Sequence, residues 1–194
     1  MEADLTALSG WFSCNGLKVN LTKTELILFG TSSSLKKPEN CTISFDGVFL
    51  KPAQSIKVLG VVLDSELSMK QQVNHVTRCC YSNLITLSKL RGTLPRKSLV
   101  RLIQALVFPH IAYCLPAWAP PTQQQRHRID NIINFATRIA TNKRRHEHIT
   151  AARKELGWMS FCALIDYRDS AFVHSAGHCD NGPESLQSLV LYRG

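Results

Sequence analysis

The chain changes character at one stretch, Ser55-Ile56-Lys57-Val58-Leu59-Gly60-Val61-Val62-Leu63-Asp64. This is its longest run of β-branched and other apolar residues, and it predicts a buried strand. Strand-like segments with turn signals precede it, whereas later residues follow the spacing of helices. We therefore predict an α+β fold that is mostly α, a small antiparallel hairpin or sheet followed by a helical bundle. We expect three parts, residues 1–64, residues 65–178 and a poorly ordered tail at 179–194.

The residues before this stretch predict one helix, one strand and one hairpin. Apolar residues recur at helical spacing over residues 5–12, and Gly16 supplies a left-handed helix end. Residues 24–29 have the pattern of a strand, and residues 30–40 that of a loop. The sequence Asp46-Gly47 stands between two apolar segments, which is the strongest short signal for a β-hairpin.

The residues after this stretch predict a series of helices. Asp64 or Ser68 can cap a long helix whose apolar stripe extends to Leu90 at intervals of three and four. Pro109 is expected to break or kink the next helix. The residues expected to open the further helices are Pro95, Thr122, Thr150 and Ser160.

Positive charge is concentrated in the first half of this helical part. The chain has 23 Lys and Arg residues against 14 Asp and Glu, a net charge of +9. No acidic residue occurs from Leu67 to Ile129, where nine basic residues carry the equivalent of the whole net charge. Such a segment favours a polyanionic partner, nucleic acid first and an anionic membrane second, although a solvated basic surface explains it too. The nine are Lys70, Arg78, Lys89, Arg91, Arg96, Lys97, Arg101, Arg126 and Arg128.

The cysteines and the hydropathy pattern argue against several classes of protein. The seven cysteines are odd in number, include the adjacent Cys79 and Cys80, and form no CxxC pair. This argues against a disulfide framework and a structural zinc site, and for an intracellular location, nuclear or cytoplasmic. His174, His178 and Cys179 form the only metal-like cluster, for which a structural role is favoured. We expect no membrane span and no signal peptide.

Several strings of residues occur together in the order and spacing of one family. The strings are Trp11 with Asn15-Gly16-Leu17-Lys18-Val19-Asn20 and Lys23-Thr24-Glu25, then residues 57–64, then Ala105-Leu106-Val107-Phe108-Pro109-His110-Ile111-Ala112-Tyr113-Cys114 with Trp118. In this order they resemble the end of the palm, the primer-grip strand and the thumb-side segment of reverse transcriptases of non-LTR (LINE-type) retrotransposons. Residues 132–139, 148–150 and 156–158 continue the pattern, so the resemblance covers about residues 1 to 175.

The resemblance implies an RNA-directed DNA polymerase, in which palm carboxylates hold two Mg²⁺ ions for nucleotidyl transfer. This sequence contains no Asp-Asp, Asp-x-Asp or Glu-Asp pair. Asp46 is better explained as a turn residue and Asp64 as a helix cap. We therefore expect a truncated copy that begins after the catalytic turn, retains a palm remnant and a thumb, binds no cofactor of its own and does not polymerise DNA.

Two positions in the first part match functional residues of the family. Lys23 matches a lysine near the nucleotide, where it would protonate the leaving pyrophosphate, although an ordinary surface lysine is the favoured explanation. Leu59 and Gly60 match the primer-grip turn, where glycine lets the backbone approach the primer terminus. A buried strand that needs close packing explains Leu59 and Gly60 equally well.

The basic segment matches the thumb, which follows the template–primer duplex by its phosphates. The resemblance implies weak contact with RNA–DNA or other duplex backbones, without sequence preference. The residues at Lys143-Arg144-Arg145 are expected to matter less, because Glu147 lies close by. A basic helical interaction module that binds an acidic protein or a membrane surface stays open as an alternative. The residues expected to contact nucleic acid are Leu59, Gly60, Lys89, Arg91, Arg96, Lys97 and Arg101.

The aromatic residues downstream of this segment allow two interpretations. Tyr113 and Trp118 could stack on bases, but their apolar neighbours favour a role in the core. His110 follows Pro109 in an apolar run, and we expect it to be a core histidine rather than a catalyst.

Overall fold

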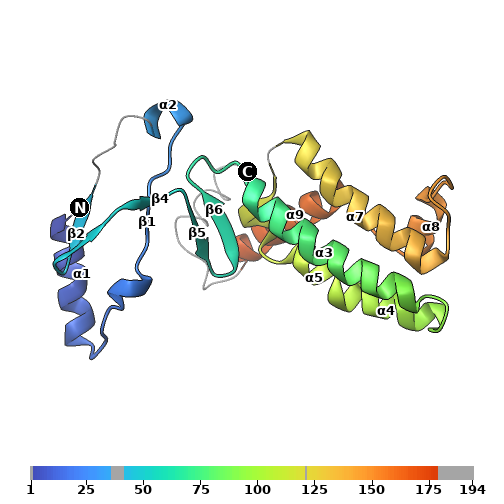
Figure 1. Cartoon of the computed structure of the whole chain (residues 1–194), viewed down its shortest axis with the longest axis horizontal. Helices are drawn as coiled ribbons and strands as arrows, with labels where there is room; N and C mark the ends of the chain where they lie inside the picture. The colour runs from blue at the N-terminus through green and yellow to red at the C-terminus, as the bar shows by residue number, and fades with distance from the viewer. Residues whose placement is uncertain (1, 36–41, 121, 179–194) are drawn as a thin grey trace. The chain divides into compact units, whose positions relative to one another are not determined.

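A computed structural model of the chain describes residues 2–35, 42–120 and 122–178 (Figure 1). The chain divides into two compact units, Met1–Gln71 and Gln72–Gly194. The described strands form three separate two-stranded sheets, all in the first unit, and most other described residues are helical. The predicted fold class, α+β and mostly α, is therefore confirmed. The tail predicted at 179–194 lies outside the described residues.

The first unit opens with α1 (Glu2–Cys14), which ends where the sequence predicts. Gly16 has a φ of +70°, and the Leu17 N–H donates to the Phe12 carbonyl at 2.9 Å, so the last turn is closed by a left-handed residue. The 3₁₀ helix η1 (Leu21–Lys23) follows.

Two short elements of the first unit differ from the prediction. The strand expected at 24–29 is reduced to β1 (Leu26–Ile27), which pairs in parallel with β4 (Pro52–Ala53), whereas an antiparallel sheet was expected. The predicted loop contains a short helix, α2 (Ser32–Leu35). Two-residue strands leave too little periodicity for a sequence pattern to show their partner.

The first hairpin is confirmed. Strands β2 (Ile43–Phe45) and β3 (Val48–Leu50) pair antiparallel around Asp46 and Gly47, whose φ angles are +47° and +79°. Two positive φ angles are what a two-residue hairpin turn requires. The Ser9 hydroxyl of α1 donates to Asp46 Oδ2 at 2.8 Å, so this carboxylate belongs to the turn, as predicted.

The stretch from Ser55 to Asp64 is a hairpin, and the prediction of one buried strand is wrong. Strands β5 (Ser55–Val58) and β6 (Val61–Asp64) pair antiparallel around Leu59 and Gly60. The φ angles of Leu59 and Gly60 are +47° and +89°. A central glycine allowed the chain to reverse where continuous apolar character predicted a straight strand.

Asp64 joins this hairpin to α3 (Lys70–Leu90). Its carboxylate accepts the backbone N–H groups of Ser68 and Met69, each at 2.8 Å. These donors precede the first helical turn, where backbone N–H groups have no partner within the helix. The expected role of Asp64 at a helix start is confirmed.

The second unit is helical, and the predicted helix starts agree with the structure within a residue or two. Thr122 caps α7 by accepting the Gln125 N–H at 3.3 Å, and Asn142 ends it with a φ of +54°. Pro109 and Pro116 lie in the first turns of two short helices, where a missing N–H costs nothing. The helices that follow α3 are α4 (Arg96–Leu106), α5 (Phe108–Ala112), α6 (Leu115–Trp118), α7 (Gln123–Thr141), α8 (Thr150–Glu155) and α9 (Phe161–His178).

The core of the helical unit contains most of the stripe predicted for α3, together with aromatic residues from later elements. Trp118 of α6 and Phe161 of α9 are both fully buried and stack with their ring centroids 6.4 Å apart. Phe108 of α5 meets Trp158 edge to face at 4.8 Å. Leu90, expected in the α3 stripe, is 42% exposed. Within the described residues no helix has the length and apolar character needed to cross a membrane.

Candidate nucleic-acid interface

The cations expected to bind nucleic acid gather around the turn that joins α3 to α4. Lys89 lies in the last turn of α3, Arg91 in the turn itself, and the other three on α4. Their side chains are exposed, whereas Leu87 and Ile103 on the same helices are buried, because helical periodicity separates the two faces. We call this set the turn cations: Lys89, Arg91, Arg96, Lys97 and Arg101.

The fold brings a carboxylate to this surface that the sequence does not place there. Arg96 Nη2 lies 2.8 Å from Glu155 Oε1 of α8, with the two side chains 53% and 62% exposed. An exposed pair of this kind contributes about 0.2–1 kcal/mol. Glu155 is 59 residues away from Arg96 in the sequence. The acid-free sequence around Arg96 therefore gave no indication of this ion pair. Arg96 is therefore less available to a ligand than the other turn cations.

The loop between α7 and α8 holds a second group of cations and closes on itself. The Lys143 ammonium donates to the His148 carbonyl at 3.0 Å, and Glu147 Oε1 accepts the Arg144 N–H at 3.1 Å. The side chains of Arg144 and Arg145 are exposed. The loop thus has a defined shape and presents two guanidinium groups to solvent.

Arg153 of α8 has a structural role instead. Its Nη1 lies 3.3 Å from Asp130 Oδ1 and 3.1 Å from Asn134 Oδ1, both on α7. The same Asp130 oxygen accepts the Phe161 N–H at 3.0 Å, at the start of α9. This cluster was not predicted, although Asp130 and Asn134 lie four residues apart on one helix face. It joins α7, α8 and α9 and supports the surface that carries the cations.

Leu59 and Gly60 form the tip of the β5–β6 hairpin. Leu59 is 85% exposed and Val58 is 43% exposed, so neither residue is buried as the strand interpretation required. A left-handed conformation costs a residue such as leucine about 1–2 kcal/mol. The tip therefore presents an apolar side chain on a strained turn, and its contact with a primer stays a prediction.

Lys23 ends η1 and is exposed. Asn20 caps this short helix by accepting the Thr22 N–H at 3.1 Å and the Thr22 hydroxyl at 2.7 Å. Nothing in this geometry tests a role for Lys23 as a general acid. Lys23 belongs to the first unit and the turn cations to the second.

The described residues do not fit the two Mg²⁺ ions of a polymerase. Among them no group of three or more His, Cys, Asp or Glu side chains could hold a metal ion. Asp46 is engaged by Ser9, and both oxygens of Asp64 accept backbone N–H groups. The cluster considered at His174, His178 and Cys179 lies partly outside the described residues.

The aromatic and histidine side chains of α5 and α6 divide between core and surface. Trp118 is fully buried and donates from Nε1 to the Tyr113 carbonyl at 2.7 Å, so it is a core residue. Tyr113 is 54% exposed, and a side-chain hydrogen bond with Cys114 raises its pKa. His110 is exposed, so the expectation of a core histidine is wrong. The adjacent Ile111 takes the inward position on α5.

The described cysteines form no disulfide, and Cys79 Sγ lies 4.0 Å from His75 Nε2. Cys14, Cys79, Cys80, Cys114 and Cys162 are all free thiols. Burial raises the pKa of Cys80 to about 12, with a smaller contribution from Cys79. A thiol with such a pKa is neither a nucleophile nor a ready metal ligand at neutral pH.

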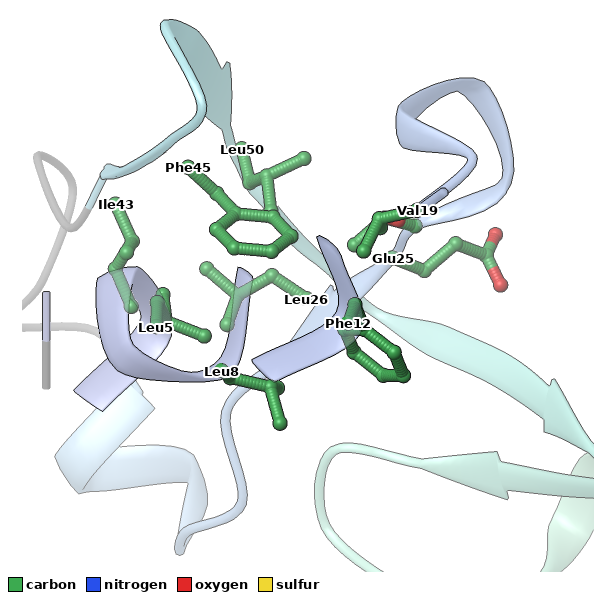
Figure 2. A pocket seen from close by; sticks show the side chains of 10 residues that line it. Leu5, Leu8, Phe12, Val19, Glu25, Leu26, Ile43, Phe45 and Leu50 are labelled. Carbon is green, nitrogen blue, oxygen red and sulfur yellow. The ribbon is translucent and has the colours of Figure 1, made fainter. Parts of the chain in front are cut away.

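The first unit contains an apolar pocket of about 270 Å³. Figure 2 shows side chains of α1 and of the β2–β3 hairpin around it, with the Glu25 carboxylate pointing away from the apolar groups. This lining can hold an apolar group, because all of its residues except Thr24 and Glu25 are apolar. The lining residues are Leu5, Leu8, Phe12, Val19, Thr24, Glu25, Leu26, Ile43, Phe45 and Leu50.

Comparison with known proteins gives one informative similarity. No protein-family model matches the chain, and no solved structure matches it. Over 148 residues the chain is 30% identical to a probable RNA-directed DNA polymerase from transposon BS of Drosophila melanogaster. The matched part is 73% of this chain but spans only 16% of that protein. The similarity supports a reverse-transcriptase-related region in this chain.

Proposed function

We propose that this chain corresponds to the end of the palm and the thumb of a non-LTR (LINE-type) retrotransposon reverse transcriptase. In this proposal the helical unit holds the template–primer by its phosphates. The observation that carries the proposal is the cluster of exposed turn cations at one end of the helical unit. The similarity to a transposon polymerase supports nucleic acid as the polyanion.

The proposed contact is electrostatic and independent of sequence. Arginine guanidinium groups bind phosphate oxygens in pairs, and lysine ammonium groups act as point charges. Each phosphate neutralised releases counterions, so affinity falls as salt rises. Lys89, Arg91, Lys97 and Arg101 should dominate, because Arg96 already has Glu155 as a partner. Such contacts give weak binding, in the range of about 10⁻⁴–10⁻⁶ M at physiological salt.

The chain by itself should not catalyse DNA synthesis. Asp46 and Asp64 are the two carboxylates considered above as possible Mg²⁺ ligands. Asp46 accepts a hydrogen bond from Ser9 in a hairpin turn, and Asp64 accepts two backbone N–H groups at a helix start. Primer extension on poly(rA)/oligo(dT) should therefore stay at the level of a blank without protein. Extension above that blank would overturn this part of the proposal.

The first unit contributes to the proposal through the β5–β6 tip. The exposed Leu59 and the positive φ of Gly60 would let the backbone of this turn approach a primer terminus. Lys23 would lie near the nucleotide only in an intact enzyme. The proposed site of action is intracellular, in the nucleus or the cytoplasm, where template RNA and primer DNA occur.

The test is the salt dependence of binding to a fluorescently labelled RNA–DNA hybrid, followed by anisotropy. Replacing Lys89, Arg91, Lys97 and Arg101 together with Gln should flatten the log–log salt slope by about 0.9 for each phosphate that is no longer neutralised. Replacing Lys18, Lys51, Arg128 and Arg168, which are also exposed, removes the same charge and should change the slope less. Equal effects of both variants would show that net charge alone accounts for binding.

An acidic protein or a membrane surface is the competing partner. A pull-down with the full chain after nuclease treatment separates it from the proposal. Loss of the captured material on nuclease treatment supports nucleic acid. Capture that survives nuclease and depends on the turn cations would favour the basic interaction module.

A further inference from the structure

A second group of exposed cations lies beside the turn cations in the helical unit. The ion pair between Arg96 and Glu155 joins the start of α4 to the end of α8. Figure 1 shows α8 and the preceding loop at the same end of the unit as the α3–α4 turn. We call Arg144, Arg145 and Lys154 the loop cations; their side chains are exposed and form no salt bridge within the described part of the chain.

The carboxylates near this end are already engaged. Glu155 pairs with Arg96 at 2.8 Å, and Asp130 binds Arg153 and the Phe161 N–H. Glu147, which led us to expect a minor role for this loop, accepts the Arg144 backbone N–H at 3.1 Å. Each carboxylate therefore satisfies a donor of the fold, and the excess of positive charge lies on the turn cations and the loop cations.

The composition of this surface distinguishes between kinds of nucleic acid. Neither residues 89–101 nor residues 143–154 contain Phe, Tyr or Trp. Proteins that bind single strands combine basic grooves with aromatic side chains on which bases stack. A surface with cations but without such aromatic residues suits the phosphates of a duplex, whose bases are already stacked.

We propose that the loop cations form a second row of phosphate contacts beside the turn cations, so that this end of the helical unit grips a nucleic acid duplex in preference to a single strand. The inference rests on the proposed function, since it presumes that the turn cations bind phosphates. It adds the α7–α8 loop and Lys154 of α8 to the interface. The hydrogen bonds of Lys143 and Glu147 within the loop define the backbone course from which Arg144 and Arg145 extend.

The test uses the full chain and two labelled probes, an RNA–DNA hybrid and the RNA strand alone. The loop variant carries Arg144→Gln, Arg145→Gln and Lys154→Gln. Its matched control carries Lys18→Gln, Lys51→Gln and Arg168→Gln, which remove the same charge elsewhere. Circular dichroism of each variant should match the original chain, because all six positions are exposed and their side chains make no described hydrogen bond.

The expected result is tighter binding of the hybrid than of the single strand. The loop variant should flatten the salt slope for the hybrid by about 0.9 for each phosphate released from the protein, beyond any change in the control. We call the variant with Lys89, Arg91, Lys97 and Arg101 replaced by Gln the turn variant. If the turn variant weakens binding while the loop variant matches its control, this inference is overturned and the proposed function stands. If neither the turn variant nor the loop variant differs from its control, the proposed function fails as well. Tighter binding of the single strand would overturn the choice of duplex.

Discussion

The first unit and the helical unit differ in how completely they bury their apolar residues. In the helical unit Trp118, Phe161 and Leu84 are fully buried. In the first unit Trp11 is 57% exposed and Phe49 is 73% exposed. The helical unit thus has a packed core beneath the helices that carry its cations, whereas the first unit has short strands and an apolar pocket. The proposed binding surface therefore lies on the better packed part of the chain.

The largest effect is expected from truncating the helical core. Trp118→Ala removes the ring that stacks on Phe161 and donates to the Tyr113 carbonyl, and should lower the free energy of unfolding by about 3–5 kcal/mol. Chemical denaturation followed by circular dichroism measures this. Phe172→Ala, at a half-exposed position of α9, is the control and should stay within about 0.5 kcal/mol. A small loss of unfolding free energy in Trp118→Ala would contradict the claim that the helical unit has the better packed core.

A smaller effect is expected from the cluster that joins α7, α8 and α9. Asp130→Ala leaves Arg153 and the Phe161 N–H without this acceptor, and should cost about 1–3 kcal/mol. Because Asn134 still accepts from Arg153, Asn134→Ala should cost less than Asp130→Ala. Denaturation midpoints of the two variants test the order, and the reverse order would contradict the assignment of Asp130 as the shared acceptor.

The hairpin tip of the first unit should respond in the opposite direction. Leu59→Asn places a residue that tolerates a left-handed φ in the first turn position, and should stabilise the β5–β6 hairpin by part of the about 1–2 kcal/mol that this conformation costs leucine. Hydrogen exchange of the β5 and β6 amides measures the local stability of this hairpin, and Leu59→Asn should slow it. Gly60→Val is the opposing variant and should speed exchange. Slower exchange in Gly60→Val would show that the turn does not have its described geometry.

The smallest effect on stability is expected at the exposed ion pair. Glu155→Gln removes the partner of Arg96 and should cost no more than about 0.2–1 kcal/mol. The same change frees Arg96, so it should tighten binding of an RNA–DNA hybrid and steepen the salt slope. Anisotropy titrations of Glu155→Gln and of Arg96→Gln should therefore shift in opposite directions. Weaker hybrid binding by Glu155→Gln would argue against competition between Glu155 and phosphate.

Local signals predicted much of the fold, and distant contacts explain what was missed. Asp46-Gly47 identified its hairpin because the dipeptide itself prefers two positive φ angles. Leu59-Gly60 did not, because leucine rarely starts such a turn and its apolar neighbours favoured one long strand. The exposed positions of Lys89 and Arg101 followed from helical periodicity, whereas the contact of Arg96 with Glu155 depends on tertiary packing. The prediction that His110 is buried was wrong because adjacent residues of a helix point in different directions, and Ile111 takes the inward position on α5.

The central claim is that the α3–α4 turn binds the backbone of a template–primer duplex. Lysine acetylation footprinting of the full chain, with and without an RNA–DNA hybrid, tests it by comparing the two units in one sample. Lys89 and Lys97 are exposed in the helical unit, and Lys18 and Lys51 are exposed in the first unit. We predict that the hybrid protects Lys89 and Lys97 more than Lys18 and Lys51, and that added salt removes this protection. Unchanged reactivity of Lys89 and Lys97 under conditions where the hybrid is bound would contradict the claim.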